Sequence, residues 1–303
     1  MLAAFLTTIL FSISAVCGNR TAKLLGGTEA NFARICFAAV LLALCAHLFG
    51  GGLAGSALTI FFISGCIGFG IGDMALFQAL PRLGSRLSVL LTLCLSSPLA
   101  ALLEWLWLGT RLSPPEILFA LVILSGVALA LAPSGHVTIA RHDLIPGLCF
   151  GLLATLCQAL GAVLSRKAFS VAAAAGENID GITAAYQRIL GGVIVGAVVF
   201  AVVKWNALKK NPRREASGAW RAAWPWVLIN GLAGPALGVS CFQWALKTTP
   251  TGVVLPIVAI TPLVIIPFSY HLEGERPTRR SLLGGAVAVC GAVALAWVKT
   301  GHR

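Results

Sequence analysis

The sequence predicts an all-α integral membrane protein with ten transmembrane helices in two inverted five-helix repeats. Three observations predict this fold class. The chain of 303 residues is 58% apolar and only 11% charged, whereas soluble domains carry about 25% charged residues. Several uncharged runs, including 144–165 and 222–246, approach or exceed the ~20 residues that span a bilayer. The two halves of the chain also resemble each other.

Ten apolar segments predict the spans in chain order. Helices are expected throughout, because an open strand would leave its backbone groups without hydrogen bonds in lipid. The first segment has no basic stretch before it and no small-residue cleavage site after it, so we expect a span rather than a removed signal peptide. The expected spans are 2–18, 31–50, 57–80, 84–108, 115–133, 144–165, 182–204, 222–246, 251–271 and 281–298.

The net charge of +12 fits membrane topology better than nucleic-acid binding. Lys and Arg lie mostly in short gaps between apolar runs, where they contact anionic headgroups, and no nucleic-acid-binding motif is present. The nine cysteines lie in or beside apolar runs without Cys-x-x-Cys spacing or an accompanying His pattern. We therefore expect no disulfide framework, no metal site and no cofactor.

An internal repeat relates the two halves. The pair Phe77-Gln78 recurs as Phe242-Gln243, "SSPL" at 96–99 as "ITPL" at 260–263, and "GVALAL" at 126–131 as "GAVALA" at 291–296. Each half holds five expected spans, and an odd number of spans places the halves in opposite membrane orientations. Inverted repeats are typical of secondary transporters, whose sites lie near the midplane at the repeat interface.

The stretch from "FQALPRLG" through "SSPLAALLEWLWLGTRLSP" to "GVAL", and its twin from "CFQWALKTTP" to "GAVAL", resemble the EamA repeat of the drug/metabolite transporter superfamily. The resemblance covers essentially the whole chain, with residues 1–135 as the first repeat and 141–300 as the second. It implies a multi-pass protein of a bacterial inner or plasma membrane. It also implies a central cavity and alternating-access transport of a small organic metabolite without enzymatic activity.

Glycines and prolines occupy matched places in the two halves. Gly68 and Gly72 correspond to Gly234 and Gly238, and small residues one turn apart allow close helix packing in lipid. Pro98 and Pro262 interrupt equivalent spans, and freed carbonyls there either find partners or line a wet cavity. Each pattern is open to a purely structural explanation and to a role in a binding site.

Four ionisable residues fall inside expected spans: Arg34, Asp73, Glu104 and Arg188. Charges there cost about 2.5–3.5 kcal/mol at the bilayer centre, so each needs a partner or water. The repeat aligns Arg34 with Arg188, and two arginines at a cavity favour an anionic or zwitterionic solute. For Glu104 we expect an ion pair with Arg111 at the end of the fourth span.

Asp73 has three interpretations. The segment Gly70-Ile71-Gly72-Asp73 matches the Gly-x-Gly-Asp signature of intramembrane aspartyl proteases, but such chemistry needs two carboxylates that share a proton. The other aspartates, Asp143 and Asp180, fall in expected loops. Asp73 is otherwise a helix cap, or a cavity carboxylate that carries a coupling proton. For the protein as a whole, a membrane scaffold without transport is the third class of function, beside a transporter and a protease.

Further contact candidates are Gln78 and Gln243, which the repeat matches, and Tyr186 and Trp244, which neighbour other candidates and could stack on a solute.

The orientation of the chain in the membrane is ambiguous. Basic residues concentrate in alternate loops, such as Lys209 in the seventh, and this bias places both termini outside the cytoplasm. The family resemblance instead implies cytoplasmic termini.

Overall fold

The computed structural model describes residues 1–131, 141–210, 217–273 and 279–301, and this part of the chain is helical without a strand. The expected boundary between the halves, residues 136–140, lies outside the described residues. In chain order the helices are α1 (Leu2–Leu25), α2 (Gly27–Phe49), α3 (Leu58–Gly65), η1 (Cys66–Gly72), α4 (Asp73–Val89), η2 (Leu90–Cys94), α5 (Ser96–Leu108), α6 (Pro114–Leu131), α7 (Arg141–Ala174), α8 (Gly181–Lys210), α9 (Ser217–Gly231), η3 (Leu232–Gly238), α10 (Val239–Thr248), α11 (Thr251–Val258), α12 (Thr261–Glu273) and α13 (Arg279–Gly301).

In the described part of the chain, eight helical segments are long and apolar enough to cross a membrane: Leu2–Leu25, Gly27–Phe49, Leu58–Ser85, Leu87–Leu108, His142–Ala174, Gly181–Val203, Ala219–Thr248 and Thr251–Phe268. Two shorter apolar stretches, Pro114–Gly126 and Leu283–Leu295, coincide with the expected fifth and tenth spans. Helix α1 continues past the expected end at residue 18 to Gly26, whose φ of 84° ends it. Hydropathy locates the apolar window, but backbone hydrogen bonding continues into the polar turns beyond it.

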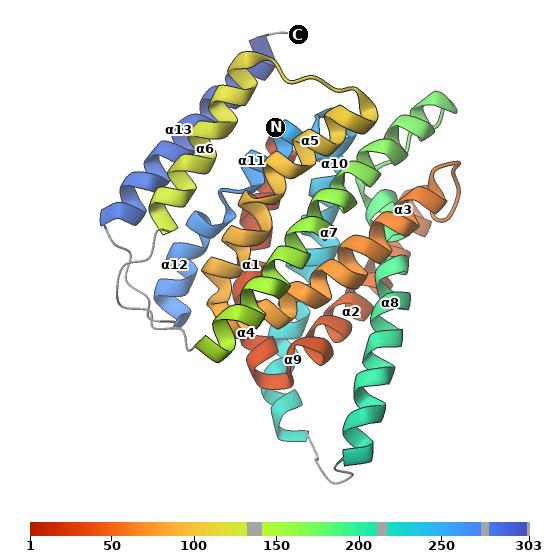
Figure 1. Ribbon diagram of the computed structural model, residues 1–303. Coiled ribbons are helices and arrows are strands. Elements are labelled where there is room, and N and C mark those ends of the chain that lie inside the picture. The colour runs from red at the N-terminus through yellow and green to blue at the C-terminus, as the bar shows by residue number, and fades with distance from the viewer. Residues whose placement is uncertain (132–140, 211–216, 274–278, 302–303) are drawn as a thin grey trace.

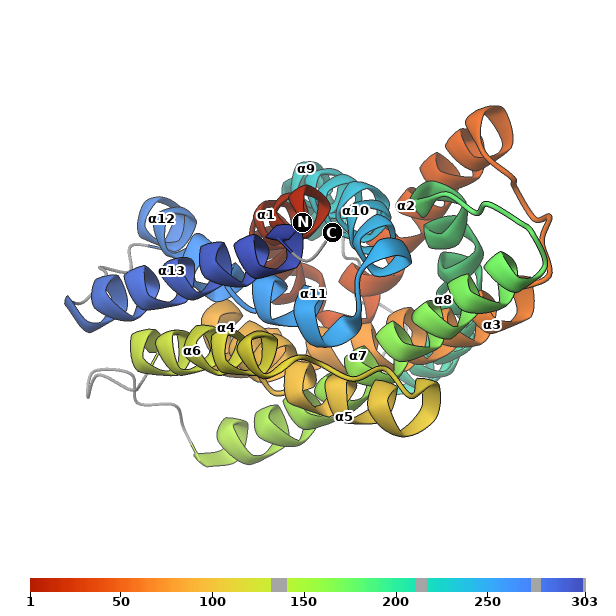
Figure 2. The same cartoon turned by 90° about the horizontal axis from the view of Figure 1, so that it is seen from above.

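The helices of the two halves pack against each other reciprocally (Figures 1 and 2). Helix α2 contacts α8, and α6 contacts α13 along its length. Helix α1 packs on α9, η3 and α10, while α7 packs in the corresponding way on α3, η1 and α4. The first turn of α1 and the last turn of α13 lie at the same end of the bundle (Figure 1), which we call the terminal end.

Irregular helix occurs at equivalent places. The π-helical segments η1 and η3 stand in the third and eighth expected spans, and a third segment, η2, stands in the fourth. In the ninth span, α11 and α12 are separated at Ala259 and Ile260. Pro98 and Pro262 lie in the first turns of α5 and α12, where a missing backbone N–H costs little. The interruptions therefore lie just before the prolines. π-Helical segments are frequent at functional sites.

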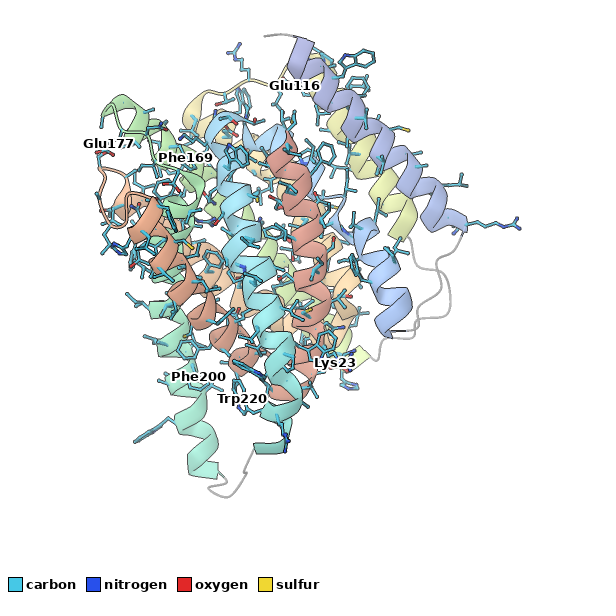
Figure 3. All side chains as sticks on the ribbon, turned by 180° about the vertical axis from the view of Figure 1, so that it is seen from behind. Lys23, Glu116, Phe169, Glu177, Phe200 and Trp220 are labelled. Atoms are coloured by element: carbon cyan, nitrogen blue, oxygen red, sulfur yellow. The ribbon has the colours of Figure 1, made fainter. Side chains whose placement is uncertain are left out.

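The outer surface of the bundle is apolar, as lipid requires. Large side chains such as Val40, Leu106 and Val198 are more than half exposed along α2, α5 and α8. Polar groups gather inside or at the two ends. Glu116 and Glu177 lie toward the terminal end, and Lys23 and Trp220 toward the opposite end (Figure 3).

Candidate functional site

A cavity of about 100 Å³ lies between the two halves. Helices α1, α2, η1, α4 and η2 of the first half line it together with α7, α8, η3 and α10 of the second. One water needs about 10–15 Å³ of such space, so the cavity holds a few waters or a small solute. Its wall is largely apolar, and the described polar lining consists of Ser14, Arg34, Asp73, Thr92, Gln158 and Arg188.

Arg34 and Asp73 form an ion pair in this cavity. Asp73 is the first residue of α4 and directly follows the π segment η1, which places its carboxylate opposite α2. Arg34 also donates from Nε to the Asn31 side-chain oxygen at 3.0 Å, and its guanidinium stacks 4.4 Å from the centre of the Phe77 ring. Arg34 is 4% exposed, so its charge is buried, and Asp73 and Asn31 accept its hydrogen bonds. Asp73 is thus a cavity carboxylate rather than only a helix-end residue.

Arg188 of α8 lines the same cavity with a different environment. It is 5% exposed and lies 5.3 Å from the centre of the Phe69 ring. Among the described residues its guanidinium donates no hydrogen bond, and its buried Nε has no acceptor. Asp73 interacts with it electrostatically but hydrogen-bonds to Arg34. Burial of a charge with so few partners is costly.

Glycines of neighbouring helices lie directly against both cavity arginines and leave room for their side chains. A Cβ at Gly68 would lie 2.9 Å from an Arg188 Nη atom, and one at Gly234 would lie 3.2 Å from an Arg34 Nη atom. One turn earlier a second glycine approaches each arginine: Gly65 packs against the backbone of Arg188, and Gly231 packs against the backbone of Arg34. The matched glycines therefore allow the close helix approach that the repeat predicts. Gly72 approaches Cys157 of α7, and Gly238 approaches Phe11 of α1.

The other four predicted contact residues, Gln78, Gln243, Tyr186 and Trp244, do not line the cavity. Gln78 donates to the Thr28 hydroxyl at 3.2 Å and accepts from Arg82. Gln243 is fully buried, and neither atom of its amide has a partner among the described residues. Tyr186 packs edge-on against a histidine of α2. Trp244 is 52% exposed on the outer face. The structure thus brings Arg34, Asp73 and Arg188 together and leaves these four outside.

Sequence reasoning missed several polar groups of the site. Gln158 of α7 and the hydroxyls of Ser14 and Thr92 line the cavity, and Asn31 orients Arg34. Two signals point to them. Gln158 is an amide inside an uncharged run, and Asn31 precedes Arg34 by one helical turn, which places both on one helix face.

A second buried polar cluster joins the halves near the terminal end. Glu104 of α5 forms an ion pair with Arg166 of α7 at 3.4 Å and accepts hydrogen bonds from the backbone N–H and hydroxyl of Thr251 in α11. Arg166 also donates to the carbonyl oxygens of Leu246 and Lys247 at 2.8 and 2.9 Å. The expected pairing of Glu104 with Arg111 is therefore wrong. The buried carboxylate pairs with Arg166 on another span, whereas Arg111 is exposed in the turn after α5.

The described cavity lining contains one carboxylate, Asp73. Asp143 lies half-exposed at the start of α7 beside His142, and Asp180 caps α8 by accepting from the backbone N–H groups of Ile182 and Thr183 at 2.8 and 2.9 Å. Neither reaches Asp73 in the described structure, so the arrangement does not favour an aspartyl protease, which requires a pair of carboxylates.

A helical bundle with several apolar spans and charged residues only in its interior and at its ends is typical of a multi-pass integral membrane protein. The model of the EamA-like transporter family matches residues 1–132 and 145–297. The chain belongs to this family and is therefore a membrane transporter. A solved crystal structure, titled only "Crystal structure of protein", has the same fold, with a TM-score of 0.71 and 17% identity over 98% of this chain and 96% of that one. No curated protein matches the sequence.

Proposed function

We propose that the protein is a secondary transporter that moves a small organic metabolite by alternating access, with ten spans in two inverted repeats, residues 1–135 and 141–300. The observation that carries this proposal is the position of the charged cavity at the interface of the halves, beside the matched π segments η1 and η3. Reciprocal packing of α1 and α7 and the separate family matches to each half support the repeat. Binding sites of inverted-repeat transporters lie at this interface.

In this mechanism one five-span half rocks against the other around the cavity. The Glu104 cluster connects α5 with α7 and α11 near the terminal end, so we propose that it closes that end in this conformation and opens in another. A buried ion pair that exchanges its partners gives the two discrete arrangements that such a switch requires.

Asp73 is the candidate for proton coupling, because it is the one described carboxylate in the cavity lining. Asp73→Asn should abolish uptake driven by a proton gradient while solute counterflow continues. Equal proton-driven uptake by the variant and the native protein would refute this role. Charge bias in the loops remains our basis for placing the termini outside the cytoplasm, and a reporter fused to either terminus tests that orientation.

Transport is tested with purified protein in liposomes. A panel of metabolites is first screened for thermal stabilisation, and counterflow of the best binder is then measured. Thr92→Phe, which fills the cavity, should abolish counterflow, whereas Val198→Phe on the exposed face of α8 should leave it unchanged. Undiminished counterflow in the Thr92 variant would place the solute path elsewhere, and no flux of any stabilising solute would refute the transporter proposal.

A further inference from the structure

The two cavity arginines occupy equivalent backbone positions. Arg34 packs its backbone against Gly231 and places its guanidinium beside Gly234, while Arg188 packs its backbone against Gly65 and places its guanidinium beside Gly68. In both halves the second glycine belongs to the π segment and stands three residues after the first. The local geometry therefore repeats, and residues at equivalent positions around each arginine can be compared directly.

The acceptors that hold Arg34 are absent around Arg188. Asn31, which accepts from Arg34 Nε, stands one turn before that arginine, and the residue one turn before Arg188 is Ala185. Asp73 directly follows the π segment of the first half, and Val239 directly follows that of the second. Val239 lines the cavity and packs in one apolar cluster with Ala185. Two apolar residues thus replace both polar partners.

The result is a local excess of positive charge. Two guanidinium groups and one carboxylate are the charged groups among the described lining residues, so this described lining has a formal net charge of +1. Arg34 and Asp73 neutralise each other, and the remaining charge belongs to Arg188, which is 5% exposed and donates no hydrogen bond among the described residues. A guanidinium offers a fork of donors that matches a carboxylate.

We propose that the cavity binds a small organic monocarboxylate, whose carboxylate pairs with Arg188 in the position that Asp73 occupies beside Arg34. This inference rests on the proposed function and names its solute class. A volume of about 100 Å³ admits only a small solute. The apolar wall, which includes Leu76, Leu93 and Phe242, suits a hydrocarbon tail better than a second charge.

The charge arrangement disfavours cations and zwitterions. A cationic group would need a free carboxylate, but Asp73 is already paired with Arg34. A solute ammonium group would also be repelled by the guanidinium group of Arg188, whose charge no carboxylate neutralises, and this repulsion is strong in a poorly hydrated site. A monoanion restores neutrality without breaking the existing pair.

The experiment uses the purified full-length protein and three probes with one carbon skeleton: butyrate, butyramide and butylammonium. Binding is measured by calorimetry and by thermal stabilisation. Four variants define the site. Arg188→Gln removes the anchor, and Val239→Asp supplies an internal carboxylate that competes for it. Val239→Asn matches Val239→Asp in size and polarity but carries no charge, so that comparing the two isolates the effect of the carboxylate charge, and Arg111→Gln controls for loss of an exposed positive charge.

Butyrate should bind the native protein and Arg111→Gln, and it should bind Val239→Asn more tightly than Val239→Asp, whereas butyramide and butylammonium should not compete with it. Arg188→Gln and Val239→Asp should each weaken butyrate binding by about 10- to 100-fold, the effect of losing a charged hydrogen bond. Because Val239→Asp retains the buried arginine and gives it a partner, this variant tests the proposal even if Arg188→Gln does not fold.

Unchanged butyrate affinity in a folded Val239→Asp protein would overturn the inference, as would equal binding of butyramide or butylammonium, or no binding of butyrate. Measurements of solute flux distinguish failure of the proposed carboxylate site from failure of the proposed transport function. Transport of a neutral or cationic solute that is insensitive to Val239→Asp would refute the carboxylate site and leave the transporter proposal standing. Butyrate binding with the expected variant pattern but without flux of any solute would support the site and refute transport.

Discussion

The segments Leu58–Ser85 and Ala219–Thr248 have similar backbone irregularities but differ in chemistry. Each contains a π segment, η1 or η3, and each π segment places a glycine beside an arginine of the other half. The first is followed by Asp73 and the second by Val239. Packing geometry therefore repeats between the halves, whereas the carboxylate occurs in one half only. The difference teaches that the repeat provides the framework of the cavity and that its charge comes from departures from the repeat.

The largest expected effect tests the shared framework. Gly65→Ala would place a Cβ against the backbone carbonyl of Arg188, and Gly231→Ala would place one 3.0 Å from the carbonyl oxygen of Arg34. Because the helix backbones themselves must separate, we expect destabilisation on the order of 3 kcal/mol for Gly65→Ala and less for Gly231→Ala. Thermal unfolding in detergent measures both. Native-like stability of the two variants would show that the close approach is dispensable.

A smaller effect tests the chemical difference. Asp73→Ala leaves the buried Arg34 without its anion and should cost about 2–3 kcal/mol, reduced from the full cost because Asp73 is partly exposed. Val239→Ala removes only apolar contacts at the equivalent position and should cost about 1–2 kcal/mol. The same unfolding assay compares them. Equal losses would mean that the ion pair adds nothing beyond packing.

The smallest expected effect concerns the starts of α2 and α8. Asp180 caps α8, whereas Gly26 at the start of α2 provides no side-chain cap. Partial burial raises the pKa of Asp180, but hydrogen bonds from Thr183 and Ile182 outweigh this effect and hold the pKa below its ordinary value. A group with a lowered folded-state pKa stabilises above its unfolded pKa and loses that contribution as pH falls through the folded value.

Asp180→Ala should therefore cost about 0.5–1 kcal/mol at neutral pH, near the lower end for a helix cap. The difference from the native protein should shrink as pH falls below the ordinary aspartate range. Unfolding midpoints recorded from pH 7 to acid for the native protein and the variant provide the measurement. A difference that stays constant with pH would contradict the assigned role.

Much of the fold could be predicted from the sequence, because length and hydropathy decide which segments can enter a membrane. They located the eight long spans, and the repeat identified Arg34 and Arg188 as equivalent. Helix rotation was harder to predict. In lipid both faces of a helix are apolar, so hydropathy could not place Trp244 outside or Gln243 away from the cavity. The partner of Glu104 lies on a distant span, and no local pattern marks such a pairing.

The central claim is that a carboxylate on one half only leaves Arg188 available to a solute in a transport cavity. Counterflow of labelled butyrate into liposomes that contain the native protein, Val239→Asp or Val239→Asn tests this claim most directly. We predict saturable counterflow with the native protein, loss of most of it with Val239→Asp, and less loss with Val239→Asn than with Val239→Asp. Equal counterflow in the Val239→Asp and Val239→Asn proteins would contradict the account.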